Sequence, residues 1–415
     1  VSYKSKITKI SSFLKKYSVN FQLVTASENC AWLLNIRGKD TKYAPIPHCY
    51  ILIDKHKNVQ VFCDLKKITS SFKKKFNKIK FIDIKKTGEC LSKIQNKKFL
   101  IDKNSCSIYF ENIILKNNLI LKYNDPIYFL KSIKTKKEIE NIKNAHVYDG
   151  VALTKYLFWL KNNYLSKNIT EISASQKLLN FRKKNKNFKH LSFPTISGSG
   201  PNGAIIHYKS SNKTNRTIKK NDILLIDSGG QYQWGTTDVT RTVSLGKVSD
   251  TIKNNFTRVL KGHIAVVNCN LKHNFNGYLI DKLARKSLNM VGLDYSHGTG
   301  HGVGFFLNVH EGPQGISKFN ETPLKKGMIV SNEPGYYHNN NYGIRIENLI
   351  YIDKSKNNLI FRNLTLAPID LKMINFKLLT KKERDYLFNY HLEVYSKLSN
   401  YLNKKEKKWL ISLIN

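Results

Sequence analysis

The sequence predicts an α/β (α+β) fold that begins with a small domain of about 130 residues. Over residues 1–130, short apolar runs typical of strands alternate with a helical pattern and with turns rich in Lys and Asn. The pattern changes near 127–135, where Thr135 and Glu138 have the spacing of a capping box that starts a long amphipathic helix. The chain has 415 residues, which is enough for two or three domains with large cores.

The elements expected in the N-terminal domain are one helix followed by short strands. The helix lies around Phe13–Tyr17, and strands are expected at Phe21–Thr25, Ala31–Leu34, Tyr50–Ile53, Val59–Phe62 and Phe99–Asp102, with a hairpin turn at His56–Asn58. These residues include no recognisable catalytic constellation, so we expect this domain to be non-catalytic.

The rest of the chain is expected to combine amphipathic helices with strands and glycine-rich segments. Helices are predicted to start at Thr135 and Thr170 and to cover Asp250–Asn268 and Phe275–Met290. Ser192–His207 is dense in Gly, Ser and Pro, and we expect a loop whose backbone passes close to another group.

A net charge of +41 is typical of proteins that bind nucleic acid or anionic membranes, but the lysines are spread along the whole chain. The sequence has no RNP motif, zinc finger or basic recognition helix, so no specific nucleic-acid partner is expected. No apolar run is long enough for a membrane helix, and the N-terminus lacks the apolar core of a signal peptide, so no membrane association is expected. The six cysteines have no zinc-ligand spacing, which favours reduced thiols in the cytoplasm.

Two aspartates mark the ends of neighbouring expected strands within Leu224–Arg241, LLIDSGGQYQWGTTDVTR. Asp227 ends an apolar run, and Asp238 starts a run of alternating residues. The residues between them are expected to join the two strands as a hairpin-like loop. Two buried carboxylates that face each other across neighbouring strands repel, and a cation relieves the repulsion. The alternative interpretation is that one aspartate belongs to a turn and the other is solvated.

Three histidines follow in glycine-rich sequence. In SHGTGHGVG, residues 296–304, His297 and His301 are four residues apart, but the glycines argue against the helix that would place both on one metal ion. We therefore expect one of them to be a ligand and the other a neighbour. His310 follows shortly afterwards in NVHEGP.

Two glutamates and an arginine complete the polar set. Glu333 directly follows the expected strand 328–332, at the start of an EPG turn. In GIRIENLI, the alternation of a strand places Arg345 and Glu347 on one face, which indicates a paired, buried polar site. His207, at the end of the glycine-rich loop, has a structural role as its simplest interpretation.

Together these residues make the donor set of a two-metal site, which consists of Asp227, Asp238, His301, Glu333 and Glu347. Two divalent ions would balance the four carboxylates. The donors are O and N atoms without a thiolate, which favours Mn or Co over structural zinc. Two such ions acidify a bridging water, which is the chemistry of amide or ester hydrolysis.

The order Asp, Asp, His, Glu, Glu resembles that of the pita-bread metallopeptidases. The motifs IDSGGQYQWGTTDVTRT, HGTGHGVGFFLNVHEGP, SNEPGYY and GIRIEN are most similar to the long cytosolic type of aminopeptidase P. The resemblance covers nearly the whole chain and implies a creatinase-like domain at 1–130, a pita-bread catalytic domain with a curved, mostly antiparallel sheet at 131–360, and a C-terminal extension at 361–415. That family has a further domain before these, and from the resemblance we expect this sequence to lack its counterpart. The chain starts with Val1 rather than Met, as a fragment or trimmed product does.

The resemblance also implies roles for the metal ligands. Asp227 would bind one ion, Asp238 and Glu347 would bridge both ions, and His301 and Glu333 would bind the other. Glu333 would also relay a proton from the nucleophilic water to the leaving nitrogen.

Other residues match positions around the family's ligands. His297 and His310 would hydrogen-bond the scissile region and the tetrahedral intermediate, and His207 would line the pocket for proline. Arg345 would steady a bridging carboxylate. The loop that holds Tyr232 and Trp234 is expected to form a wall of the active site and to contact the substrate.

The implied reaction is release of the N-terminal residue from peptides with proline at position two, with two divalent ions, most consistently Mn²⁺, with Co²⁺ or Zn²⁺ as alternatives. The family's C-terminal extension implies a homodimer, and the type implies a cytoplasmic enzyme. A prolidase, which cleaves Xaa-Pro dipeptides, uses the same five ligands and is one alternative. A non-catalytic pita-bread binding module is the other, although such modules usually lose ligands that this chain keeps.

Overall fold

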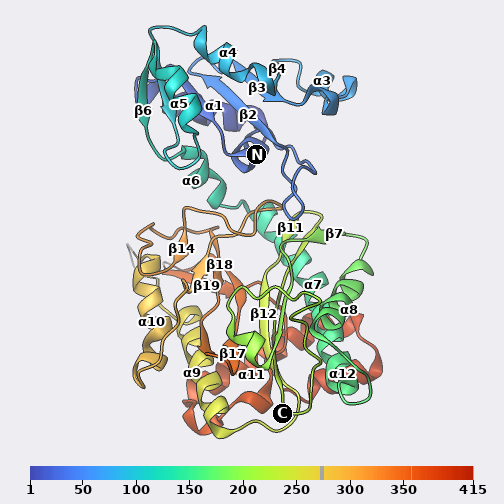
Figure 1. Cartoon of the computed structure of the whole chain (residues 1–415). Helices are drawn as coiled ribbons and strands as arrows, with labels where there is room; N and C mark the ends of the chain where they lie inside the picture. Colours follow the sequence, from blue (N-terminus) through green and yellow to red (C-terminus); the bar gives the residue numbers. More distant parts are fainter. Residues whose placement is uncertain (272–274, 357, 415) are drawn as a thin grey trace. The chain divides into compact units, whose positions relative to one another are not determined.

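The computed structural model describes residues 1–271, 275–356 and 358–414 (Figure 1). The fold divides into two compact units, Val1–Lys131 and the chain from Ser132 onward. Within the described ranges, no helix is long and apolar enough to cross a membrane.

The first unit is a mixed six-stranded sheet covered by helices, with the strand order β4-β3-β2-β1-β5-β6. Its strands are β1 (Phe21–Val24), β2 (Cys49–Asp54), β3 (Val59–Cys63), β4 (Ile79–Asp83), β5 (Lys98–Ile101) and β6 (Leu119–Lys122). Its helices are α1 (Tyr3–Lys16), α2 (Ser27–Leu34), α3 (Ser70–Lys75), α4 (Thr87–Ser92), α5 (Ile108–Leu115) and α6 (Pro126–Ser132). Successive residues of β2 face opposite sides, because Ile51 and Ile53 join one apolar cluster and Leu52 joins the other.

The strand expected at Ala31–Leu34 is wrong, because these residues form the last turn of α2. Glu28 lies in the first turn, where a carboxylate is favoured by the helix dipole. Asn35 ends the helix in a left-handed conformation, and its N–H bonds back to the carbonyl of Ala31. A run of four apolar residues fits a buried helix and a buried strand equally well, so periodicity could not decide between them.

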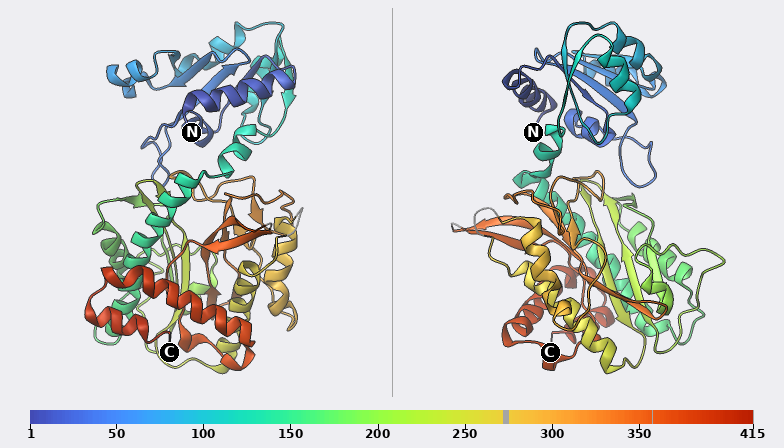
Figure 2. Two further views of the ribbon diagram at one scale, coloured as in Figure 1. Left: turned by 180° about the vertical axis from the view of Figure 1, so that it is seen from behind. Right: turned by 60° about the vertical axis from the view of Figure 1, so that its left-hand side comes forward.

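The second unit places helices on both sides of several small antiparallel sheets. The helices are α7 (Lys136–Asn163), α8 (Glu171–Lys183), α9 (Asp250–Val267), α10 (Gly277–Asn289), α11 (Lys381–Leu398) and α12 (Lys404–Ile411). The capping box predicted at the start of α7 is present: the Thr135 side chain accepts from the Glu138 N–H, and the Glu138 carboxylate accepts from the Thr135 N–H. Figures 1 and 2 show α7 and α8 on one side of the strands and α9 and α10 on the other.

Every pairing between named strands in the described part of this unit is antiparallel. The sheets have the orders β12-β9-β8, β15-β18-β19, β11-β10-β7, β16-β17 and β13-β14. The strands are β7 (Phe188–Leu191), β8 (Ile196–Ser199), β9 (Ile223–Ser228), β10 (Gly230–Tyr232), β11 (Gly235–Thr236), β12 (Val239–Ser244), β13 (Gly300–His301), β14 (Gly315–Ile316), β15 (Ile329–Asn332), β16 (Gly335–His338), β17 (Tyr342–Arg345), β18 (Asn348–Ser355) and β19 (Asn358–Asn363). The predicted fold class, antiparallel sheets flanked by helices after a mixed α/β domain, is confirmed.

Two apolar cores hold the strands that carry the polar residues. Leu224 and Val243, on β9 and β12, pack with Leu157 of α7. Ile344 of β17 packs in a second cluster with Leu260 of α9. Because the apolar residues of each strand pack against a helix, the polar residues of the strand face away from that helix.

Candidate active site

The two aspartates lie at the same end of the β9–β12 pair. β12 runs antiparallel to β9, with Asp227 opposite Thr240 and Ser228 opposite Val239. Asp238 immediately precedes β12, and both carboxylates are buried. The prediction of two neighbouring strands with acidic ends is confirmed.

The loop between the aspartates does not form a wall of this site, contrary to the expectation. It folds into β10 and β11, and β10 pairs with β11 on one side and with β7 on the other in a separate sheet. Tyr232 is fully buried against Phe188, its hydroxyl donates a 2.8 Å hydrogen bond to Asp149, and it does not line the pocket at the aspartates. Trp234 lies edge-to-face on Phe306 at the loop tip. A buried aromatic residue beside a site in sequence can belong to the core, as Tyr232 does.

Glycines on both sides of His301 allow its segment to approach the other strands. A Cβ on Gly300 would lie 1.9 Å from the Ser331 carbonyl oxygen, and one on Gly302 would lie 2.0 Å from the Glu311 carbonyl oxygen. No side chain fits at these distances, so the glycine-rich sequence is a requirement of close backbone packing.

The His301 ring is oriented by its own backbone. Its Nδ1 lies 2.9 Å from the Gly302 carbonyl oxygen, a contact that places the proton on Nδ1. Its Nε2 then faces Asp238 and Glu333, whose nearest oxygens are each 3.4 Å away. A ring nitrogen and two carboxylates that converge in this way offer a set of ligands for a metal cation.

The Ser331 side chain connects His301 and Glu333, two expected ligands from different segments of the sequence. Its hydroxyl accepts a 2.8 Å hydrogen bond from the His301 N–H and donates a 2.9 Å hydrogen bond to Oε1 of Glu333. The sequence analysis missed Ser331, because a serine within a strand carries no distinctive signal.

Glu347 lies between β17 and β18, so the single strand expected across 343–350 is interrupted. One carboxylate oxygen accepts a 2.8 Å hydrogen bond from the Thr240 hydroxyl. Its backbone carbonyl accepts from Arg241, a fully buried side chain that also donates to the Tyr390 hydroxyl of α11. The C-terminal helices therefore help to fix the backbone at Glu347.

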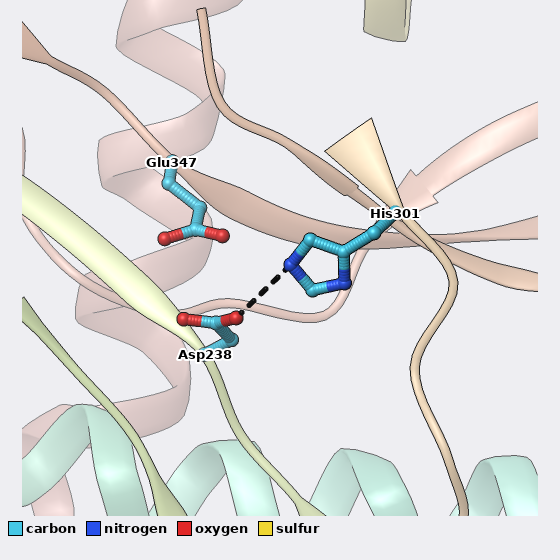
Figure 3. A group of neighbouring side chains, drawn as sticks. All are labelled: Asp238, His301 and Glu347. Atoms are coloured by element: carbon cyan, nitrogen blue, oxygen red, sulfur yellow. Dashed lines mark ion pairs between the residues drawn. The ribbon is translucent and has the colours of Figure 1, made fainter. Parts of the chain in front are cut away.

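The five predicted ligands all line one pocket, and three of them form a compact metal-binding group. Ligand atoms of Asp238, His301 and Glu347 lie within 4.8 Å of one another (Figure 3). One buried carboxylate oxygen each of Asp227, Asp238 and Glu347 has no hydrogen-bond partner within the described residues. Buried oxygens without donors are costly, and their convergence fits divalent cations with hard O and N ligands.

The electrostatics of the pocket lead to the same conclusion. Burial, followed by the charges of Asp227 and Glu333, raises the pKa of Asp238 well above its usual value. Burial and the charge of Asp238 likewise raise the pKa of Glu347, and burial raises the pKa of Glu333. These shifts come first from burial and second from repulsion between the carboxylates, and bound cations would offset both effects.

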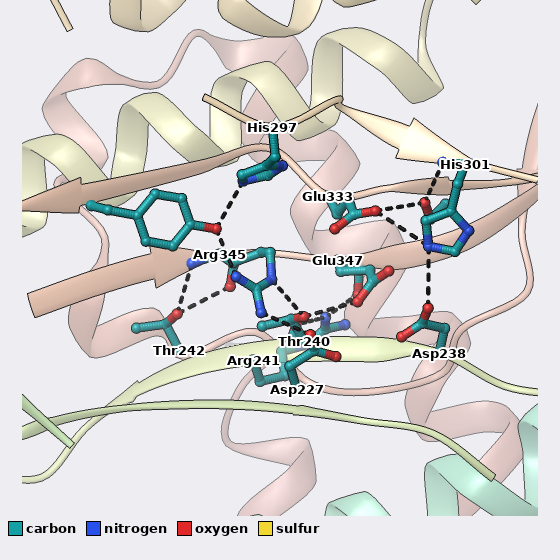
Figure 4. Close-up of polar contacts among 12 residues, drawn as sticks. Asp227, Asp238, Thr240, Arg241, Thr242, His297, His301, Glu333, Arg345 and Glu347 are labelled. Atoms are coloured by element: carbon teal, nitrogen blue, oxygen red, sulfur yellow. Dashed lines mark hydrogen bonds and ion pairs between the residues drawn. The ribbon is translucent and has the colours of Figure 1, made fainter. Parts of the chain in front are cut away.

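A chain of hydrogen bonds joins Asp227 to His297 across the pocket (Figure 4). Arg345 donates from Nη2 to Asp227 at 2.7 Å and from Nη1 to the Tyr337 hydroxyl at 2.7 Å. That hydroxyl lies 2.8 Å from Nε2 of His297. Arg345 therefore steadies Asp227, whereas a bridging carboxylate had been expected. Tyr337 was missed, although it stands four residues after Glu333 in the quoted SNEPGYY.

The pocket has a volume of about 420 Å³ and is lined by both polar and apolar side chains. The polar lining residues include the five expected ligands, His297, His310 and Arg345, and the apolar ones include Phe193, Pro194, Ile196 and Ile206. His207 also lines the pocket and is exposed. His310 packs on His301 with 4.1 Å between ring centroids. Burial lowers the pKa of both His297 and His310 to about 4, so both rings are neutral at neutral pH.

Family models match most of the chain. Metallopeptidase family M24 matches residues 140–354, the Creatinase/Prolidase N-terminal domain matches residues 1–138, and the C-terminal region of peptidase M24 matches residues 357–413.

Individual relatives agree with the family models. Xaa-Pro aminopeptidase 1 of Dictyostelium discoideum is 41% identical over 98% of this chain and 67% of its own length. A probable Xaa-Pro aminopeptidase P of Laccaria bicolor is 39% identical over 99% of this chain and 66% of its own length, so the chain spans about two thirds of such relatives. The crystal structure of X-prolyl aminopeptidase from Caenorhabditis elegans, described as a cytosolic enzyme with a di-nuclear active site, is 31% identical with a TM-score of 0.94, over 100% of this chain and 71% of that one. The chain therefore belongs to metallopeptidase family M24, in which it groups with the Xaa-Pro aminopeptidases.

Proposed function

We propose that this protein is a metallo-aminopeptidase that hydrolyses the N-terminal Xaa-Pro bond of peptides with two divalent metal ions. The observation that carries the proposal is the convergence of four carboxylates and one imidazole on one pocket, with three buried carboxylate oxygens lacking partners in the described chain. The similarity to Xaa-Pro aminopeptidases supports the proline specificity.

The donor set fits two ions. Asp227 would bind one ion, His301 and Glu333 the other, and Asp238 and Glu347 both. O and N donors without thiolate favour Mn²⁺, with Co²⁺ or Zn²⁺ as alternatives. When bound, the ions would polarise the scissile carbonyl and acidify a water molecule.

The remaining residues would position the peptide and move protons. Glu333 would carry a proton from the attacking water to the leaving proline nitrogen, because its carboxylate lines the pocket beside the other expected ligands. His297 and His310, both neutral, would hydrogen-bond the scissile region. The apolar side chains of Phe193, Pro194 and Ile206, which line the pocket with His207, would hold the proline ring. In an Xaa-Pro bond the proline nitrogen is a tertiary amide nitrogen, and it leaves as a secondary amine. This nitrogen must be protonated as the bond breaks, so the site must provide a dedicated acid.

We further propose three functional segments: a creatinase-like domain at 1–130, the catalytic domain at 131–360 and a C-terminal extension at 361–415, whose last residue lies outside the described residues. The matched family segments support this division. A homodimer and a cytoplasmic location complete the proposal. Light scattering and cell fractionation test these two points.

The activity is tested with peptides of different length, with and without added Mn²⁺. We expect hydrolysis of Arg-Pro-Pro after metal loading, loss of activity on chelation, and no activity on Xaa-Pro dipeptides. Cleavage of dipeptides alone would instead identify a prolidase. Failure of the purified protein to take up more than trace Mn, Co or Zn would identify a non-catalytic binding module.

A further inference from the structure

One lysine stands at the pocket without a partner. Lys209 is the sole lysine among the described residues that line the pocket. Its side chain is exposed, and its ammonium group forms no hydrogen bond or ion pair within residues 1–271, 275–356 and 358–414. The other cation at the pocket, Arg345, is already committed to Asp227 and Tyr337. Lys209 is therefore the cation that a ligand can reach.

The segment that carries Lys209 is fastened to the fold at the preceding residue. Tyr208 is buried, and its hydroxyl donates a 2.8 Å hydrogen bond to the fully buried Glu171. Asn202 and the Arg216 N–H also donate to that carboxylate, which ties both ends of the loop to one point. With Tyr208 held inward, Lys209 on one side and His207 on the other are exposed and line the pocket.

Charge determines which end of a peptide Lys209 can meet. The N-terminal amine of a substrate is cationic, so Lys209 repels it, whereas the carboxylates that line the same pocket attract it. The negative groups that a peptide can offer are its C-terminal carboxylate and acidic side chains. Lys209 follows His207 by two residues, a span of at most about 7 Å, which is the reach of roughly two extended residues.

We propose that Lys209 is a specificity residue that binds a carboxylate on the residue after proline. This inference rests on the proposed function, because it assumes that proline lies beside His207. Lys209 thereby favours tripeptides, through their C-terminal carboxylate, or peptides with an acidic residue at the third position. An exposed ion pair of this kind changes affinity by about two- to fivefold and weakens as salt rises.

The test measures binding of leaving-group dipeptides, so that it does not depend on turnover. The full chain loaded with Mn²⁺ is titrated by calorimetry with Pro-Ala and Pro-Ala-NH₂, and with Pro-Glu-NH₂ and Pro-Gln-NH₂. The variants are Lys209→Met and, as the matched control, Lys213→Met, an exposed lysine of the same loop that does not line the pocket.

We expect the unmodified protein to bind at least one carboxylate ligand about two- to fivefold more tightly than its neutral partner. Lys209→Met should abolish this preference and its salt dependence, and Lys213→Met should retain both. A preference in the first dipeptide pair identifies the C-terminal carboxylate, and one in the second pair identifies an acidic side chain.

Three results would overturn the proposal. In the first, the unmodified protein binds charged and neutral dipeptides equally, or binds none of the four dipeptides. In the second, Lys209→Met keeps the full preference for the carboxylate ligand. In the third, Lys213→Met loses that preference. Absence of Xaa-Pro hydrolysis by the metal-loaded protein would contradict the proposed function instead, and the dipeptide comparison would still decide the role of Lys209.

Discussion

Nη2 of Arg345 lies 2.7 Å from Oδ2 of Asp227, and both side chains are buried. The other oxygen of Asp227 has no partner within the described chain and faces the pocket with Asp238 and Glu347. The guanidinium therefore holds one oxygen of the carboxylate and leaves the second for a cation. Although burial alone would lower the pKa of Arg345, Tyr337 and Asp227 raise it well above its usual value, so the group stays charged.

Replacing Arg345 should weaken metal binding more than it affects folding. Arg345→Met removes the group that orients Asp227, and loss of such a support typically lowers metal affinity by about 10–100-fold. Arg345→Lys should recover only part of this, because one ammonium cannot reach Asp227 and Tyr337 in the geometry of the guanidinium. Equilibrium dialysis with Mn²⁺ measures the change, and Arg362→Met, at an exposed position, is the control. Wild-type metal affinity in both Arg345 variants would contradict this role.

Asp238→Ala should abolish activity and leave the fold intact. The carboxylate is proposed to bridge both ions, so its loss removes ligands from each, whereas Asp238 makes no contribution to the apolar cores. We expect a decrease of at least about 1,000-fold in kcat/KM, equivalent to about 4 kcal/mol, with an unchanged circular dichroism spectrum. Asp385→Ala, at an exposed site on α11, should behave like the parent protein. Near-normal activity of Asp238→Ala would exclude the two-metal site.

The metal-free protein should become less stable as pH rises, and metal should remove this dependence. Asp238 and Glu347 have pKa values raised above those of the unfolded chain, which are about 3.9 and 4.3. Between the unfolded and folded pKa values the folded state holds more protons, so the free energy of unfolding falls with increasing pH across that window. Thermal melting with and without chelator measures the effect, and Mn²⁺ should raise the melting temperature more at about pH 8 than at about pH 5. An equal increase at both values would show that the pKa values of these carboxylates are not raised in the folded protein.

The residues that converge on the pocket could be selected from the sequence because their chemistry coincides with local pattern. Asp227 ends an apolar run, Asp238 starts an alternating one, and the glycines around His301 signal close backbone packing that the structure shows at Gly300 and Gly302. The order of the five residues then indicated the family. These residues could be selected without knowing which strands are neighbours, except for the hairpin-like pair of strands next to Asp227 and Asp238.

What could not be predicted depends on contacts between distant segments. Ser331 connects His301 to Glu333, and Tyr337 connects Arg345 to His297, but hydroxyl residues in strands have no pattern of their own. Ala31–Leu34 was assigned to a strand because four apolar residues do not distinguish the two periods. Tyr232 was placed at the site because proximity in sequence was taken for proximity in space.

Ser331→Ala should lower metal affinity by about tenfold through two ligands at once. The hydroxyl fixes the backbone of His301 and one oxygen of Glu333, so its removal frees both to move. Titration with Mn²⁺ measures the loss, and Ser331→Thr, which keeps the hydroxyl, should restore part of the affinity. Ser317→Ala, on another loop of the same unit, serves as control. If Ser331→Ala bound metal like the parent, the two contacts would have no role in the site.

Tyr232→Phe separates a core residue from a substrate-binding one. The hydroxyl donates to Asp149, which also pairs with the buried Arg182, so its removal breaks a hydrogen bond to a charged group. Such a bond contributes about 1.5–3 kcal/mol, and the melting temperature should fall by about 3–8 °C. KM for Xaa-Pro peptides should not change, because the phenol does not line the pocket. Tyr278→Phe, at a partly exposed position, should alter neither quantity. A tenfold increase in KM with an unchanged melting temperature would instead return Tyr232 to the substrate site, since only a lost contact with the peptide changes binding without changing stability.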